Sequence, residues 1–153
     1  RGGVIYDPDG TDEHPDADVV IVCVGELPYA EFFGDVGHDT GDFELTLPDA
    51  QRSCIASYAQ RGRKVIVVLI TGRPLLVTEE ITASDAFVAA WLPGSEGAAV
   101  AEVLFGDFNF KGSLPHSWPR SAGNLKGKYG PNFWDSDAYP LFPMGFGLRY
   151  GSL

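Results

Sequence analysis

Three apolar runs constrain the fold of this 153-residue chain most, because each has the length of a strand and none alternates with polar residues. They lie at residues 18–25, 64–70 and 86–91. Continuous apolar runs are typical of strands covered on both faces, as in parallel sheets. Helical patterns lie between and after them, which indicates right-handed βαβ units. We therefore predict an α/β fold, a three-layer sandwich-type domain with a mainly parallel open sheet flanked by helices.

The best helical patterns predict two helices and one shorter piece. We expect Thr46 to cap a helix that runs to about Arg61 and ends at Gly62. The second runs from Glu96 to about residue 105, and the short piece lies near residues 78–83. The apolar positions of the first helix are Cys54, Ile55, Tyr58 and Ala59, and those expected to point inward from the second are Val100, Val103 and Leu104.

Composition divides the chain into a short leader and one domain. Residues 1–16 are rich in Asp, Gly and Pro and are interpreted as a linker or an excised boundary. We assign residues 17–150 to one α/β domain and residues 151–153 to a tail. A sheet of three strands leaves an exposed edge, which predicts dimerisation, strand exchange or a need for a further part of the domain.

Charge and composition exclude several function classes. The net charge of -10 argues against general binding to nucleic acid or anionic membranes. No apolar run approaches the ~20 residues of a membrane span, and the N-terminus has no signal-peptide pattern. The three histidines lack metal-ligand spacing, so we expect no metal site and no cofactor. Cys23 and Cys54 are expected to be buried free thiols rather than a bridge.

The segment after the first strand carries the most chemistry. Ligands of open α/β sheets gather beyond the carboxyl ends of the strands. There, Glu26, Glu31 and Asp35 alternate with the aromatic residues Tyr29, Phe32 and Phe33. Rings stack on the apolar faces of sugars and carboxylates bind hydroxyls, while apolar surroundings raise the pKa of a carboxyl group, as a general acid requires. From composition alone, a solvated acidic loop is the simpler interpretation.

Other candidate residues have equally simple structural interpretations. Arg73 is suited to grip a carboxylate or to form a structural salt bridge. Glu96 fits a capping role at a helix N-terminus, and Trp91 and Trp118 fit a core. No serine lies in a G-x-S-x-G pattern and no G-x-G-x-x-G follows the first strand, which weakens a serine hydrolase and a dinucleotide-binding fold.

Several motifs in order resemble one known family. The segment GELPYAEFFGD at residues 25–35 is similar to the G-E-x-P-Y-x-E-x-x-G-D signature of the exo-β-glucan glucohydrolases of glycoside hydrolase family 3. The motifs that follow also resemble that family: TGRP at 71–74, DAFVAAWLPGSEG at 85–97, LFGD at 104–107, GSLP at 112–115 and YPLFPMGFGL at 139–148. The resemblance covers about residues 18–150 and only the later part of the family's C-terminal α/β sandwich domain.

The resemblance implies roles for particular residues. In this family a barrel domain supplies an Asp nucleophile, and the sandwich domain contributes the acid/base on a loop. Carried over by position, Glu31 is the implied acid/base, and Glu26 is implied to be structural, bonding loop amides at the strand end. Tyr29, Asp35 and Arg73 are implied to support the substrate loop. The alternative that Glu26 is the acid/base stays open.

The resemblance also implies an activity. It is retaining hydrolysis of β-glucosides or β-glucans, with the two carboxyl groups about 5–5.5 Å apart. Because the barrel motif is absent from this sequence, we expect the isolated chain to be inactive without a separate barrel domain. The alternative is a non-catalytic glycan-binding or scaffold module with the same fold. The family implies a periplasmic or secreted location, and the sugar and its linkage stay open.

Overall fold

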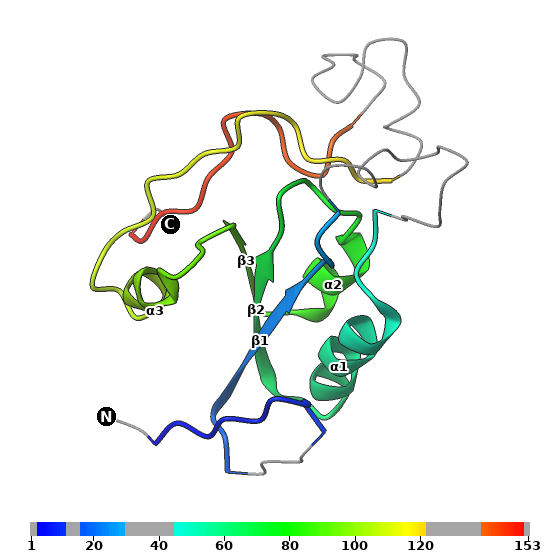
Figure 1. The fold of residues 1–153 in the computed structure, drawn as a ribbon, viewed down its shortest axis with the longest axis vertical. Helices are drawn as coiled ribbons and strands as arrows, with labels where there is room; N and C mark the ends of the chain where they lie inside the picture. The colour runs from blue at the N-terminus through cyan, green and yellow to red at the C-terminus, as the bar shows by residue number, and fades with distance from the viewer. Residues whose placement is uncertain (1–2, 12–15, 30–44, 122–138, 152–153) are drawn as a thin grey trace.

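The computed structural model describes residues 3–11, 16–29, 45–121 and 139–151 (Figure 1). These residues form three strands and three helices in alternation: β1 (Val19–Gly25), α1 (Asp49–Gln60), β2 (Lys64–Ile70), α2 (Thr78–Ala83), β3 (Ala86–Trp91) and α3 (Gly97–Leu104). The sheet has the order β1-β2-β3, and both neighbouring pairs are parallel. The predicted α/β class with an open parallel sheet is confirmed.

The register brings the carboxyl ends of the three strands to one edge of the sheet. Gly25 at the end of β1 lies opposite Ile70 at the end of β2. On the other side of β2, a bulge lets Ile70 pair with Trp91 at the end of β3. Trp91 has a φ of 58°, in the left-handed region that bulky residues rarely adopt. The strand therefore ends there with an abrupt change of direction.

The core lies between one face of the sheet and the helices α1 and α2 (Figure 1). Ile55 and Tyr58 of α1 are buried there, with Cys54 and Ala59 packed at the margin, so the predicted apolar face of this helix is confirmed. The sheet contributes alternate side chains, as its pleat requires. They are Val22 and Val24 of β1 and Val65, Val67 and Leu69 of β2.

The ends of α1 agree only in part with the prediction. The helix begins at Asp49 and its N-cap residue is Pro48, which makes no side-chain capping bond, so the prediction that Thr46 is the N-cap residue is wrong. Gly62, with a φ of 71°, follows the helix, and its amide bonds the carbonyl oxygen of Ala59. This is the termination that glycine in the left-handed region permits.

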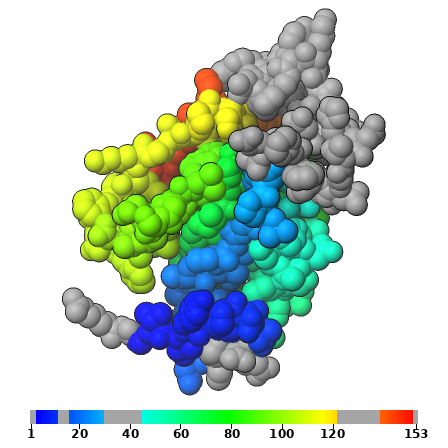
Figure 2. Space-filling model, in the orientation of Figure 1, coloured from blue at the N-terminus to red at the C-terminus, as the bar shows by residue number. Residues whose placement is uncertain are grey.

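The other face of β1 is open. Val19 and Ile21 are 44% and 42% exposed, and Cys23 is exposed on the same face. In Figure 2 the side chains of β1 reach the surface between the N-terminal segment and α3. The predictions that β1 is covered on both faces and that Cys23 is buried are therefore wrong for the described residues. α3 likewise buries none of its residues, and Val100, Val103 and Leu104, which were expected to point inward, are only half-buried.

Two segments after α3 run side by side across the carboxyl edge of the sheet (Figure 1). We call residues 111–120 and 139–148 the C-terminal strap. An antiparallel bridge joins Trp118 to Phe142, and the Leu114 amide donates a 2.8 Å hydrogen bond to the carbonyl oxygen of Phe146. Trp118 is 3% exposed, and its indole Nε1 donates a 2.7 Å hydrogen bond to the Leu75 carbonyl oxygen. Trp118 thus attaches the strap to the core, as its predicted core position requires.

The predictions about membrane spans, domain limits and cysteines concern the chain as a whole. Within the described ranges, no helix has both the length and the apolar character needed to cross a membrane. The domain limits at residues 16–17 and 150–151 stay predictions. The two cysteines are free, as predicted.

Candidate functional site

Glu26 directly follows β1 and forms an ion pair at the carboxyl edge of the sheet. Its Oε2 atom accepts a 2.9 Å hydrogen bond from Nε of Arg73, and its Oε1 atom lies 2.6 Å from the hydroxyl oxygen of Thr71. The two charged side chains are 10% and 16% exposed. We expected Glu26 to bond loop amides, whereas these partners are side chains that follow β2. Both carboxylate oxygens are thereby engaged as acceptors.

Thr71 connects the ends of all three strands. It is 1% exposed, and its amide donates a 3.1 Å hydrogen bond to the carbonyl oxygen of Trp91. Its hydroxyl oxygen lies 2.6 Å from the Arg73 carbonyl oxygen as well as from Glu26, and it accepts a 3.2 Å bond from the Arg73 amide. A hydroxyl has one proton, so it donates to one of these two acceptors at a time. Thr71 belongs to the TGRP motif but is not among the predicted site residues, although a polar residue directly after a buried strand is a signal for this edge.

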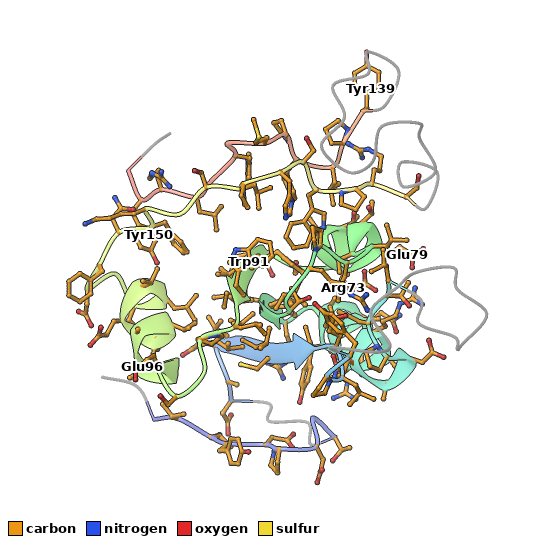
Figure 3. The ribbon with its side chains drawn as sticks, turned by 45° about the horizontal axis from the view of Figure 1, so that its top comes forward. Arg73, Glu79, Trp91, Glu96, Tyr139 and Tyr150 are labelled. Carbon is orange, nitrogen blue, oxygen red and sulfur yellow. The ribbon has the colours of Figure 1, made fainter. Side chains whose placement is uncertain are left out.

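Tyr29 lies against the guanidinium group of Arg73. The guanidinium carbon is 3.9 Å from the centre of the tyrosine ring, which is cation–π geometry. The guanidinium group of Arg73 therefore bonds Glu26 through its edge and packs its face against the Tyr29 ring. In Figure 3, Arg73 lies near the tip of the β1 arrow. Of the two interpretations of Arg73, the salt bridge is the one that the structure contains.

Trp91 brings a second aromatic group to the same edge. Its ring packs edge-on against His116 at 6.0 Å and tilted against Trp118 at 5.9 Å. Trp91 is half-buried at the margin of the core rather than within it. These contacts join the end of β3 to the C-terminal strap.

The remaining candidates lie apart from this group or outside the described residues. Glu96 occupies the N-cap position of α3, but its side chain makes no capping bond, and its Oε1 atom accepts a 3.1 Å hydrogen bond from Ser95. Figure 3 shows it distant from Arg73. Glu31 and Asp35 lie outside the described residues, and Tyr29 precedes Glu31 by two positions. Among the described residues, no cluster of three His, Cys, Asp or Glu side chains is suited to a metal ion.

Comparison with known proteins defines the class to which this edge belongs. The sequence profile of the glycosyl hydrolase family 3 C-terminal domain matches residues 8–150. The chain belongs to this family, and the resemblance in the motifs is confirmed.

Relatives and solved structures agree with that assignment. The periplasmic β-glucosidase of Salmonella typhimurium is 35% identical over 88% of this chain, and the lysosomal β-glucosidase of Dictyostelium discoideum is 33% identical over 88%. The crystal structure of an exo-1,3/1,4-β-glucanase from a Pseudoalteromonas species has a TM-score of 0.74 and 39% identity, covering 94% of this chain and 18% of that one. The chain spans 19% and 16% of the two curated relatives, about a fifth of their length.

Proposed function

We propose that this domain supplies the general acid/base of a retaining β-glucosidase-type glycoside hydrolase, and that Glu31 is the residue. The observation that carries the proposal is the ion pair of Glu26. Because Arg73 and Thr71 engage both oxygens of Glu26, this carboxylate is suited to hold structure rather than to exchange protons with a substrate. Glu31 is the other glutamate of the family signature, five positions further along.

The reaction needs two carboxyl groups that face each other across the glycosidic bond. An Asp from a barrel domain attacks the anomeric carbon while the acid protonates the leaving oxygen, and the resulting carboxylate then activates water. Carboxyl groups about 5–5.5 Å apart give retention of configuration. We infer that the substrates are β-glucosides or β-glucans, since the relatives include β-glucosidases and an exo-1,3/1,4-β-glucanase.

The partner that this proposal requires is a barrel domain, and the isolated chain is then inactive. The open face of β1 supports a need for further polypeptide, because parallel sheets are normally covered on both faces. A homodimer through this face is the alternative. The names of two relatives, periplasmic and lysosomal, support a periplasmic or secreted location, which fractionation of the source cells would test.

The test compares Glu31→Gln with Glu26→Gln in the chain joined to the barrel domain of a family 3 relative. Each variant is assayed on aryl β-glucosides with a poor and a good leaving group. A general acid contributes about 10²–10⁴-fold, and its loss affects poor leaving groups most. Glu31→Gln should therefore lower kcat/KM mainly on the poor leaving group. Glu26→Gln acts on the acid/base only through Arg73, so its loss should be smaller and should differ less between the two leaving groups.

If instead Glu26→Gln lowers kcat/KM mainly on the poor leaving group and Glu31→Gln does not, the acid/base is Glu26 and the proposed role of Glu31 is wrong. Hydrolysis by the isolated chain would show that the nucleophile lies within it. Measurable sugar binding without hydrolysis, even in the joined protein, would favour the alternative of a non-catalytic glycan-binding module.

A further inference from the structure

Gly72 and Tyr29 approach so closely that a side chain at position 72 would force the tyrosine hydroxyl group to shift. A Cβ atom on Gly72 would lie 2.6 Å from the hydroxyl oxygen of Tyr29. The next neighbours of that Cβ, Cδ1 of Leu92 at 3.5 Å and Cζ of Tyr29 at 3.6 Å, are at ordinary contact distance. The hydroxyl group of Tyr29 therefore occupies the space that a side chain at position 72 would need.

The ring of Tyr29 is held at two places. Its face lies 3.9 Å from the guanidinium carbon of Arg73, which is itself anchored by Glu26 at 2.9 Å. Its hydroxyl end lies over the backbone of Gly72. Since Arg73 and Gly72 follow the rigid strand β2, the ring is fixed relative to the sheet. The backbone that carries the ring is fixed with it.

We propose that Tyr29 is a positioning residue for the acid/base, and that its hydroxyl group lies in the space left by the missing side chain of Gly72. We call this contact between Tyr29 and Gly72 the seat. This inference rests on the proposed function, in which Glu31 carries the acid/base. Tyr29 precedes Glu31 by two positions and is the described residue nearest to it in the sequence, so we expect a displacement of Tyr29 to displace Glu31. A misplacement of about 1 Å in a catalytic group can cost about 10²-fold in rate.

The test is a double-mutant cycle with a matched control. Gly72→Ala introduces the clash, Tyr29→Phe removes the hydroxyl that suffers it, and the double variant has neither. Gly97→Ala is the control, because a Cβ there meets nothing within 4 Å. All are assayed in the chain joined to the barrel domain of a family 3 relative, with poor and good leaving groups.

We expect Gly72→Ala to lower kcat by about 10–100-fold on the poor leaving group, with a smaller loss on the good one and little change in KM. The double variant should return to within about threefold of Tyr29→Phe, since the phenylalanine ring keeps its place over Arg73. Gly97→Ala should match the unaltered protein. An equal loss on both leaving groups, or a loss that Tyr29→Phe does not restore, overturns the inference.

A second measurement does not depend on catalysis. Exchange of the amide hydrogens of Glu26, Leu27 and Tyr29 in the chain as it stands should become faster in Gly72→Ala and return toward its original rate in the double variant. If Glu31→Gln shows no dependence on leaving group while exchange follows this pattern, the proposed function fails and the seat is still present. If exchange is unchanged in Gly72→Ala, the seat does not exist.

Should Gly72→Ala fail to fold, recovery of folding by adding Tyr29→Phe supports the seat. Failure of both the single and the double variant to fold overturns it.

Discussion

Nε of Arg52 on α1 donates a 2.9 Å hydrogen bond to Oε1 of Glu80 on α2, whose side chain is 5% exposed. The same guanidinium group lies 2.8 Å from Glu79, which is 82% exposed. The hydrogen bond to Glu80 and the charge of that carboxylate raise the pKa of Arg52. One arginine thus serves a buried and a solvated partner, and the two helices that cover the core are joined through it.

This arrangement predicts unequal effects of two identical substitutions. Glu80→Gln should lower the free energy of unfolding by about 1–3 kcal/mol, because a buried hydrogen bond to a charged group is weakened. Glu79→Gln should change it by no more than about 0.5 kcal/mol, since exposed ion pairs contribute little. Urea unfolding of both variants measures the difference. Equal losses would show that Glu80 is not buried as described.

Trp118 gives a second matched pair. Trp118→Phe keeps an aromatic ring but leaves the buried carbonyl oxygen of Leu75 without its 2.7 Å donor, at a cost of about 1–3 kcal/mol. Tyr150→Phe also removes a donor to carbonyl oxygens, those of Val103 and Leu104. Tyr150 is exposed, so water replaces the lost bond and the change should be below about 0.5 kcal/mol. Thermal unfolding distinguishes them, and a larger effect of Tyr150→Phe would contradict the burial of Trp118.

Buried Tyr58 and partly buried Cys54 on α1 predict loss of stability in alkali. Burial raises the pKa of Cys54 above 9.0 and that of Tyr58 above 10.0, and the negative charge of Asp7 adds to both. The unfolded chain therefore releases these protons first. The contribution is fully present below the unfolded pKa values and is lost as the pH rises through the folded ones.

Urea unfolding on both sides of pH 9.0 measures this effect. The slope of stability against pH should be shallower in Cys54→Ala and in Tyr58→Phe, each compared with its own value at neutral pH. Slopes identical to that of the unaltered chain would contradict the raised pKa values.

The strands and α1 could be predicted from the sequence because their patterns are local. Apolar runs, the face of Ile55 and Tyr58, and the stop at Gly62 depend on neighbours within a few residues. The open face of β1 could not be predicted, because an apolar run reports which residues tend to be covered and not what covers them. The sequence places the N-cap of α1 at Thr46, because threonine is a favourable cap type, whereas Pro48, which has no capping group, occupies that position.

The candidate site was predicted unevenly for a similar reason. The family motifs at residues 25–35 and 71–74 predict a role for Glu26, Tyr29 and Arg73, and the structure brings these three residues together. Their mutual contacts, and the central place of Thr71, depend on the register of β1 against β2 and could not be read from spacing along the chain. The left-handed conformation of Trp91 likewise follows from a bulge between neighbouring strands.

Cys23 offers a direct measurement of what the open face of β1 contacts. Thiol reagents react with accessible thiolates, so exposed Cys23 should be labelled faster than Cys54, which is partly buried and whose pKa is raised by burial. Cys23→Ser and Cys54→Ser provide single-cysteine chains that separate the two rates. When the chain is joined to the rest of a family 3 enzyme, labelling at Cys23 should slow by about tenfold or more if further polypeptide covers the face. Labelling at an unchanged rate in the joined protein, with Cys54 as the internal reference, would show that the face stays open and that the requirement for a partner lies elsewhere.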